Sequence, residues 1–225
     1  MKQELISLEL ELKKFLDQGF SEADLEGLKV FLEELTRWSQ RFNLVSKQDI
    51  GRLLERHLAD SLILRPFINP SWKIADVGSG GGFPGLPLAI IFRSTSFLLI
   101  EPRKNRAQFL KHIKRNLGLT SVEVVERRVE ALEERLKEVD SFLFRAVGEV
   151  QNILLQIRPW MKPSVKILIL TSEGKFSHKI PGFDIKSHPY HLKKGDWGGI
   201  IVEITVSRET DEGDGRNIIA GWDRK

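Results

Sequence analysis

A glycine-rich turn between an apolar strand and an apolar helix is the segment of this chain best suited to hold a ligand. Four glycines fall within residues 78–82, after the mostly apolar run Trp72–Val77 and before Leu86–Ile91. Glycine accepts positive φ angles and lets a ligand lie against the backbone. A strand that ends in such a turn, with a helix behind it, is how an α/β sheet holds a nucleotide-like molecule at its carboxyl edge. The next apolar strand ends at Glu101, where a carboxylate can accept both hydroxyls of a ribose.

The glycine spacing fits two classes of cofactor. Gly80, Gly82 and Gly85 match the dinucleotide pattern, which alone is weak evidence for NAD. In a dinucleotide site the last glycines open a helix whose N-terminus faces the pyrophosphate. Here Phe83 and Pro84 interrupt that point. An NAD-dependent oxidoreductase is therefore the alternative and not the first interpretation.

A second register through the same turn favours a methyl donor. Counted from Asp76, the glycines resemble the first motif of class I methyltransferases, which bind S-adenosylmethionine. That cofactor has no phosphate, and it needs a backbone that passes close to its methionine moiety, an acid for its ribose and an apolar slot for its adenine. Glu101 would serve the ribose, and residues 128–130, just past the third expected strand, would flank the adenine. The glycines that would lie against the methionine moiety are Gly78, Gly80 and Gly82.

The residues at the end of the fourth expected strand bear on the methyl acceptor. The chain has no cysteine, which the C5-pyrimidine enzymes use as a nucleophile. Exocyclic amino methylation usually goes with an Asn/Asp-Pro-Pro-aromatic motif, but residues 144–148 read Phe-Arg-Ala-Val-Gly. Arg145 stays protonated and is a poor base, whereas it could donate to the O6 edge of a guanine. A purine ring nitrogen needs no deprotonation to attack. A salt bridge at the strand end is an equally open interpretation of Arg145.

Basic residues gather after Glu101. Six Lys or Arg and one acid lie within residues 101–115, in a chain with a net charge of +4 and a pI near 9.3. A basic patch beside a nucleotide-type pocket indicates a polyanionic partner, and a solvated helix face is the open alternative. The residues that we expect to bind RNA are Arg103, Lys104, Arg106, Lys111 and Arg127.

Composition favours one soluble α/β domain with an added N-terminal element. Hydrophobic residues make up 41% and charged residues 29% of the 225 residues, and no apolar run approaches the length of a membrane span. Residues 1–20 carry acids and do not read as a signal peptide. The absence of cysteine fits a cytoplasmic protein. We expect a monomer that binds no membrane and no metal.

The apolar periodicity predicts helices first and an alternating α/β pattern afterwards. We expect an N-terminal helical extension over 1–70, with a helix before Gly19, a long helix after a capping box at Ser21 and Asp24, and a third helix over 50–64. The methyltransferase domain would span 71–207, and 208–225 would form a C-terminal tail.

From Trp72 onward the pattern predicts a doubly wound parallel sheet with an antiparallel edge. The expected strands are 73–77, 96–101, 122–126, 141–147 and 165–170, followed by a hairpin of 185–192 and 200–206. The expected helices are 86–92, 103–117, 129–138 and 150–160. With the glycine motif after the first strand, this order of elements resembles the Rossmann-like fold of class I S-adenosylmethionine-dependent methyltransferases.

Six segments of the chain together carry a more specific resemblance. They are Arg41–Ser46, Arg56–Ser61, Asp76–Pro87, Glu101 with Lys104, Arg106, Phe109 and Leu110, Arg128–Glu130, and Arg145-Ala146. Asn43-Leu-x-Ser followed by Arg-His-x-x-Asp-Ser is specific in order and spacing. On these segments the chain resembles the glucose-inhibited division protein B family, the small-subunit rRNA guanine-N7 methyltransferases.

The resemblance implies methyl transfer from S-adenosylmethionine to N7 of a guanine in the decoding region of 16S rRNA, with the rRNA or the small ribosomal subunit as partner. A non-catalytic RNA-binding or ribosome assembly factor is a further alternative. The residues that would contact or border the cofactor are Gly78, Phe83, Val129, Glu130 and Arg145. The residues that would lie at the pocket mouth and position the substrate are Asn43, His57, Asp60 and Ser61.

Several of these residues also have a purely structural interpretation. His57 could be packed on its helix, Asn43 could cap the end of the long helix, and Asp60 could pair with Arg56. Trp38 and Phe42 fit helical core spacing better than a base-stacking platform.

Phe83 is the exception among these residues. An aromatic ring in a Gly-Phe-Pro-Gly turn is expected to find little core to join. A wall of the cofactor or substrate pocket is therefore the favoured interpretation of Phe83.

The C-terminal part departs from the family pattern in three places. Family members often carry Lys-Gly after the fifth strand, where this chain has Glu173-Gly174, and Arg-His in the last hairpin, where it has Gly198-Gly199. The tail 211–225 also extends past the usual end. These differences bear on how the C-terminal side meets RNA and leave the glycine loop untouched.

Overall fold

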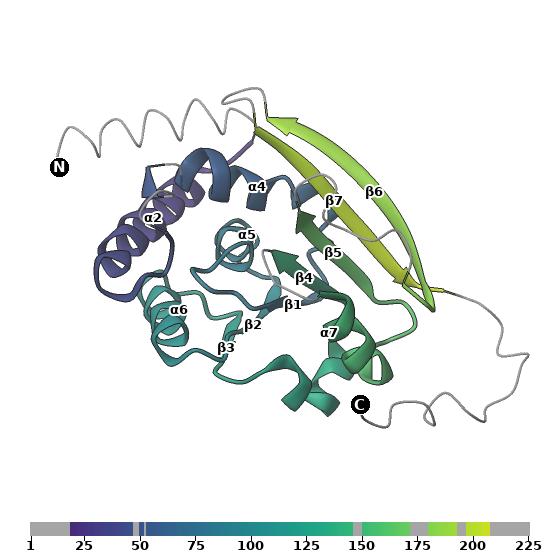
Figure 1. The fold of residues 1–225 in the computed structure, drawn as a ribbon. Helices are drawn as coiled ribbons and strands as arrows, with labels where there is room; N and C mark the ends of the chain where they lie inside the picture. Colours follow the sequence, from purple (N-terminus) through teal and green to yellow (C-terminus); the bar gives the residue numbers. More distant parts are fainter. Residues whose placement is uncertain are drawn as a thin grey trace, which may run out of the picture.

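A computed structural model describes residues 19–46, 50–51, 53–145, 150–171, 180–192 and 197–207. Its centre is a seven-stranded sheet in the order β3-β2-β1-β4-β5-β7-β6 (Figure 1). The strands are β1 (Lys73–Val77), β2 (Ser96–Ile100), β3 (Val122–Val125), β4 (Ser141–Arg145), β5 (Lys166–Thr171), β6 (Phe183–Leu192) and β7 (Trp197–Val206). The expected first helix, the tail and Glu173-Gly174 lie outside the described residues.

The sheet is parallel from β3 to β5 and antiparallel at one edge. β1 pairs in parallel with β2 and β4, and β5 pairs in parallel with β4 and antiparallel with β7. β6 and β7 form the expected C-terminal hairpin. The predicted doubly wound sheet with an antiparallel edge is therefore confirmed. Parallel strands bring their carboxyl ends to one edge, where the predicted ligand-binding residues meet.

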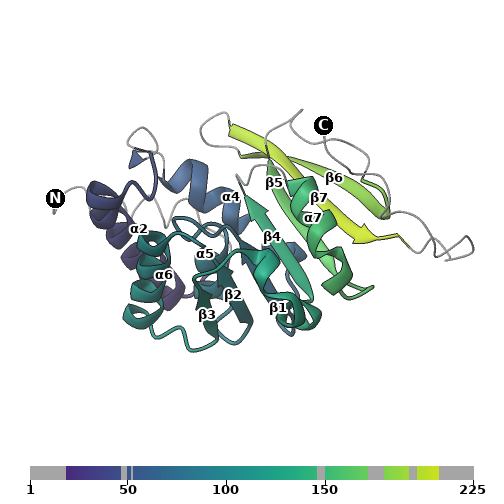
Figure 2. The ribbon, with the colours of Figure 1, turned by 60° about the horizontal axis from the view of Figure 1, so that its bottom comes forward.

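Two layers of helices cover the sheet, as Figure 2 shows. Leu98 and Ile100 face the layer with α7, whereas Phe97 and Leu99 face the layer with α2, α5 and α6. This alternation has the period of two that a strand buried on both faces requires. The α-helices are α2 (Glu22–Phe42), α4 (Ala59–Leu62), α5 (Gly85–Ile91), α6 (Lys104–Asn116) and α7 (Val150–Ile157). The shorter helical turns are η1 (Leu53–Leu58), η2 (Arg65–Phe67), η3 (Val129–Ala131), η4 (Glu133–Glu138) and η5 (Arg158–Trp160).

The long helix α2 begins and packs as predicted. The Ser21 hydroxyl accepts from the Asp24 amide at 3.2 Å, and the Asp24 carboxylate accepts from the Ser21 amide at 2.9 Å, which completes the capping box. On the buried face, Glu34 lies 2.9 Å from Nε2 of His112 on α6. This contact and the surrounding apolar side chains fix α2 across α5 and α6.

Two segments that were predicted to be α-helices form other types of helical turn. Residues 129–138 form two 3₁₀ turns instead of one α-helix, because Glu133 has a φ of +24°, which no right-handed helix continues. Residues 53–58 form a π-helical turn before the α-turn 59–62. The Ser61 hydroxyl donates to the His57 carbonyl at 2.7 Å across this junction, a bond of the kind that bends helices.

No helix in the described part of the chain is long and apolar enough to cross a membrane.

Candidate active site at the carboxyl edge of the sheet

The glycine loop leaves β1 with a backbone that only glycine adopts easily. Gly78, Gly80 and Gly82 have φ angles of +72°, +54° and +96°. The amides of Gly78 and Ser79 donate to the Ile100 carbonyl at 2.8 and 3.1 Å, which ties the loop to the end of β2. The loop then enters α5 at Gly85, after Phe83 and Pro84. The predicted strand, glycine turn and helix are therefore all present.

Asp76 is buried directly beneath this loop. One carboxylate oxygen accepts from the Gly85 amide at 3.1 Å, and the other has no hydrogen-bond partner among the described residues. A Cβ atom on Gly85 would lie 2.6 Å from the carboxylate, so only glycine lets α5 approach this closely. Burial, with a smaller contribution from the Glu101 carboxylate, raises the pKa of Asp76 from 3.8 to about 7. Asp76 is therefore a half-protonated acid near neutral pH.

Glu101 connects the glycine loop to helix α6. Its Oε2 accepts from the Gly80 amide at 2.9 Å, and its Oε1 accepts from the Arg103 amide at 2.8 Å. The side chain is buried, and Arg103 is the N-cap residue of α6. The carboxylate therefore lies at the carboxyl edge of the sheet, as a ribose acceptor would, and it also supports the start of α6.

Phe83 packs between the core and two polar residues. Its ring is only 5% exposed and meets Phe31 of α2 edge-on at 5.2 Å. The expectation that this ring finds little core was wrong, because α2 lies over the loop and supplies it. The His57 ring stacks on Phe83 at 5.3 Å, and the Arg145 guanidinium carbon lies 5.8 Å from the ring centroid. Phe83 thus brings His57 and Arg145 to one place.

Asp60 is the centre of a network that reaches the far edge of the sheet. Its carboxylate pairs with Nη2 of Arg145 at 3.2 Å and accepts from the Tyr190 hydroxyl at 2.8 Å. The same Arg145 nitrogen donates to the Arg56 carbonyl at 3.0 Å. Burial and then the Asp60 carboxylate raise the pKa of Tyr190, so the hydroxyl stays protonated as a donor. The strand-end salt bridge expected for Arg145 is present, and it fixes the guanidinium beside Phe83.

Tyr190 was missed by the sequence interpretation. It is the only tyrosine of the chain and lies on β6, opposite Gly199 of β7. A Cβ atom on Gly199 would lie 2.9 Å from the Tyr190 hydroxyl and 2.9 Å from the Thr171 carbonyl. The glycine pair Gly198-Gly199, which stands where the family often has Arg-His, could have indicated this contact, because a glycine opposite a large ring makes room for it.

Asn43 ends α2 as a left-handed cap. Its φ and ψ are 47° and 48°, and its amide donates to the Ser39 carbonyl at 3.3 Å. The next residue lies against the glycine loop, since a Cβ atom on Gly81 would be 3.4 Å from the Leu44 carbonyl. The capping role expected for Asn43 is confirmed, and the cap brings the end of α2 to the loop.

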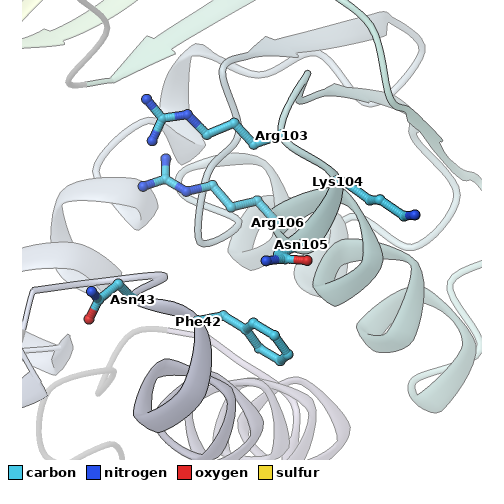
Figure 3. A pocket seen from close by; sticks show the side chains of 6 residues that line it. All are labelled: Phe42, Asn43, Arg103, Lys104, Asn105 and Arg106. Atoms are coloured by element: carbon cyan, nitrogen blue, oxygen red, sulfur yellow. The ribbon is translucent and has the colours of Figure 1, made fainter.

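The remaining predicted site residues do not all converge. Arg103, Lys104 and Arg106 line one pocket with Asn43 (Figure 3). Lys111 lies farther along α6 and pairs with Glu126 at 3.1 Å. The last basic residue, Arg127, is exposed after β3, outside that pocket.

The residues after β3 are partly buried at the same edge of the sheet. Val129 is 4% exposed and packs in the core layer that contains Ile100. Glu130 has a buried Oε2 without a hydrogen-bond partner in the described part of the chain. With Asp76, the edge therefore carries two buried carboxylate oxygens that have no hydrogen-bond partner among the described residues.

These features fit S-adenosylmethionine. The loop offers backbone without side chains at three positions of positive φ, and the Glu101 carboxylate lies at the same edge of the sheet, where the sequence places the ribose acceptor. Among the described residues no cluster of three or more His, Cys, Asp or Glu could hold a metal ion.

Comparison with solved structures places the fold. The chain superposes on MtNAS, solved with MTA and tNA, with a TM-score of 0.57 and 16% identity over 91% of this chain and 86% of that one. It superposes on P. horikoshii TYW2, solved with MeSAdo, with a TM-score of 0.52 and 13% identity over 67% and 62% of the chains. These structures share the Rossmann-like, doubly wound fold that the sequence predicts.

Comparison with curated proteins gives closer relatives. The chain is 38% identical over 149 residues to ribosomal RNA small subunit methyltransferase G of Halorhodospira halophila, covering 66% of this chain and 70% of that protein. It is 38% identical over 154 residues to the protein of that name from Wolinella succinogenes, covering 68% and 78%. A match to the Cellvibrio japonicus protein of that name is 40% identical over 113 residues and covers 48% and 52%.

The family comparison agrees with the predicted resemblance. Residues 24–179 match GidB, rRNA small subunit methyltransferase G, so the matched range includes all but the first two residues of α2, the glycine loop and Arg145. With the relatives and the geometry above, the chain belongs to the GidB family of rRNA small subunit methyltransferases.

Proposed function

We propose that this protein transfers a methyl group from S-adenosylmethionine to N7 of a guanine in the decoding region of 16S rRNA. The observation that carries the proposal is the placement of Arg145 beside the glycine loop, where Phe83, Asp60 and the Arg56 carbonyl fix its guanidinium. Membership of the GidB family supports the rRNA substrate. It favours neither an NAD-dependent oxidoreductase nor a non-catalytic assembly factor.

The cofactor would lie across the glycine loop. Gly78, Gly80 and Gly82 would face its methionine moiety, Glu101 would accept from its ribose hydroxyls, and Val129 with Glu130 would border its adenine. S-adenosylmethionine supplies an electrophilic methyl group on a sulfonium. The chain's contribution is to hold the acceptor in line with that group, and positioning of this kind can lower a barrier by about 7–11 kcal/mol.

Arg145 suits an acceptor that needs no general base. A guanidinium stays protonated at physiological pH, so it orients a base by donating hydrogen bonds and does not remove a proton. Guanine presents O6 beside N7 on one edge, and arginine commonly donates hydrogen bonds to this edge. Asp60 keeps the guanidinium oriented, and the His57 ring, which stacks on Phe83, forms part of the same wall.

The proposal is tested by methyl transfer to 16S rRNA and to small ribosomal subunits, followed by mapping of the modified atom. We expect one N7-methylguanine with the wild-type protein, and a loss of about 10²-fold or more in rate for Arg145→Gln, which removes a pre-positioned donor. Arg115→Gln removes the same charge at the C-terminal end of α6 and serves as the control. Methylation of a carbon or of an exocyclic amine would refute the N7 assignment.

The cofactor is tested separately by calorimetry. We expect S-adenosylhomocysteine to bind and NAD not to bind. Glu101→Gln should weaken the binding of S-adenosylhomocysteine, because the charged acceptor of the ribose is lost. Gly78→Asp would fill the space of the ligand. If this variant lost cofactor binding yet kept every RNA-dependent phenotype, a non-catalytic role would replace the proposal.

We further propose that the protein acts in the cytoplasm as a monomer. The absence of cysteine and the ribosomal substrate of the curated relatives support the location. Size-exclusion chromatography with light scattering tests the monomer.

A further inference from the structure

A polar pocket opens between the end of α2 and the start of α6, shown in Figure 3. It has a volume of about 350 Å³. Figure 3 shows the Arg103 and Arg106 side chains running side by side, with Phe42 and Asn43 on the opposite wall. The lining residues are Phe42, Asn43, Arg103, Lys104, Asn105 and Arg106.

The pocket is strongly cationic. Three of its six lining residues are positively charged and none is negatively charged. No ion pair in the described part of the chain involves Arg103, Lys104 or Arg106, whereas Lys111 on the same helix pairs with Glu126. Helix α6 starts here, and the one carboxylate at its start, Glu101, is buried and holds the amides of Gly80 and Arg103. The pocket therefore attracts an anion.

Phe42 gives the pocket an aromatic surface that faces solvent. Its ring is 40% exposed, one of two large hydrophobic side chains that are exposed in the described residues. The expectation that Phe42 joins the core was wrong. Trp38 contacts Phe109 and His112, whereas Phe42 contacts Trp38 and stays exposed to solvent. The left-handed cap at Asn43 ends the helix directly after Phe42 and leaves the ring at the pocket wall.

The pocket adjoins the glycine loop. A Cβ atom on Gly80 would lie 3.4 Å from Nη1 of Arg106, so this guanidinium reaches the loop. After the pocket residue Asn43, the Leu44 carbonyl lies equally close to a Cβ atom on Gly81. A nucleic acid strand that presents a base at the loop would place a neighbouring nucleotide in this pocket.

We propose that this pocket binds the nucleotide next to the target guanine in single-stranded RNA, with its phosphate on Arg103 and Arg106 and its base stacked on Phe42. This inference rests on the proposed function and names the subsite that holds the strand. Guanidinium groups pair well with phosphate oxygens, and an aromatic side chain stacks on any unpaired base. A base-paired nucleotide would not fit this arrangement, because its faces are already covered by its neighbours.

The stacking contact is tested with three labelled 12-nucleotide RNAs that carry one central guanine. The first is intact, and the other two have an abasic residue on the 5′ or the 3′ side of the guanine. We expect Phe42→Leu to weaken the intact RNA about tenfold in fluorescence anisotropy, and Phe42→Tyr to leave its affinity within twofold. For one of the two abasic RNAs, Phe42→Leu should weaken the affinity less than twofold. An equal loss on all three RNAs would overturn the stacking role, as would an undetectable affinity of the wild-type protein.

The phosphate contacts are tested by salt dependence. For each of Arg103→Gln and Arg106→Gln, the slope of log Kd against log salt concentration should fall by about 0.7 from that of the wild-type protein. Arg115→Gln, at the far end of α6, should leave the slope unchanged. Slopes that do not differ between Arg103→Gln and Arg115→Gln would overturn the phosphate subsite.

Two further measurements separate this inference from the proposed function. S-adenosylhomocysteine affinity should stay within twofold in Phe42→Leu, which shows that the fold and the cofactor site are intact. The modified atom, mapped with wild-type protein, decides the proposed function alone. N7 methylation with no effect of Phe42 or Arg103 would therefore refute the subsite and leave the function standing.

Discussion

The buried carboxyl group of Asp76 should make the stability of this protein fall as the pH rises. The pKa of Asp76 is raised from 3.8 to about 7 in the folded chain, chiefly by burial. Below pH 3.8 the group is protonated in both the folded and the unfolded chain, so its titration does not change the free energy of unfolding. Between 3.8 and 7 the unfolded chain ionises first, so the free energy of unfolding decreases by about 1.4 kcal/mol per pH unit. Above pH 7 the cost is constant at roughly 4 kcal/mol.

The change Asp76→Asn removes this titration and nearly keeps the shape of the side chain. The amide oxygen can still accept from Gly85, and other titrating groups cancel when the two proteins are compared at each pH. Relative to Asp76→Asn, the wild-type protein should lose about 3 kcal/mol in free energy of unfolding between pH 5 and pH 8. Urea denaturation at pH 5, 6, 7 and 8, with unchanged m-values, measures the difference directly.

A control with the opposite sign sharpens this test. The hydrogen bond from Arg135 lowers the pKa of Glu123, so its contribution is present above the ordinary pKa and is lost as the pH falls. Relative to Glu123→Gln, the wild-type protein should therefore lose stability toward acid. A flat difference between the wild-type protein and Asp76→Asn from pH 5 to pH 8 would refute the assignment of a buried, half-protonated carboxyl.

Two further substitutions test the loop and the network around it. Gly82→Ala should destabilise by about 2–5 kcal/mol, because its φ is +96° and a Cβ atom would lie 2.6 Å from Leu86; Gly118→Ala, with a φ of +62° and open space, should cost about 1 kcal/mol in the same urea titration. Equal losses for the two alanines would argue against the close packing of the loop. Tyr190→Phe removes the hydrogen bond to Asp60 and should cost about 1–2 kcal/mol in stability. It should lower kcat for methyl transfer while S-adenosylhomocysteine binding is retained, and a loss of cofactor affinity instead would place Tyr190 elsewhere in the mechanism.

The regular part of the fold could be predicted because its signals are local. β1 has the predicted bounds, and α2 has the predicted capping box, since apolar alternation and a cap depend on neighbouring residues. The region after β3 could not be assigned correctly, because two 3₁₀ turns keep Val129, Leu132 and Leu136 buried and satisfy the same apolar spacing as an α-helix. The left-handed φ of Glu133 that separates the turns has no signature in residue type.

The site was predictable where a motif lies within one segment. The glycine loop and Glu101 meet as expected, because the ends of parallel neighbouring strands share an edge. The surroundings of Phe83 and Phe42 were not predictable, since they depend on how α2 crosses the sheet. Tyr190 reaches Asp60 across 130 positions of the chain, and only the sheet order β5-β7-β6 brings that hairpin within range.

The contact between Tyr190 and Gly199 constrains which sequences this fold accepts. A side chain at position 199 would displace the ring that holds Asp60, so the two positions cannot change independently. Among relatives they should covary: a large aromatic at 190 with glycine at 199, or a smaller residue at 190 with a side chain at 199. The tyrosine on β6 and the glycine opposite it on β7 would then change together, although both lie far along the chain from the glycine loop.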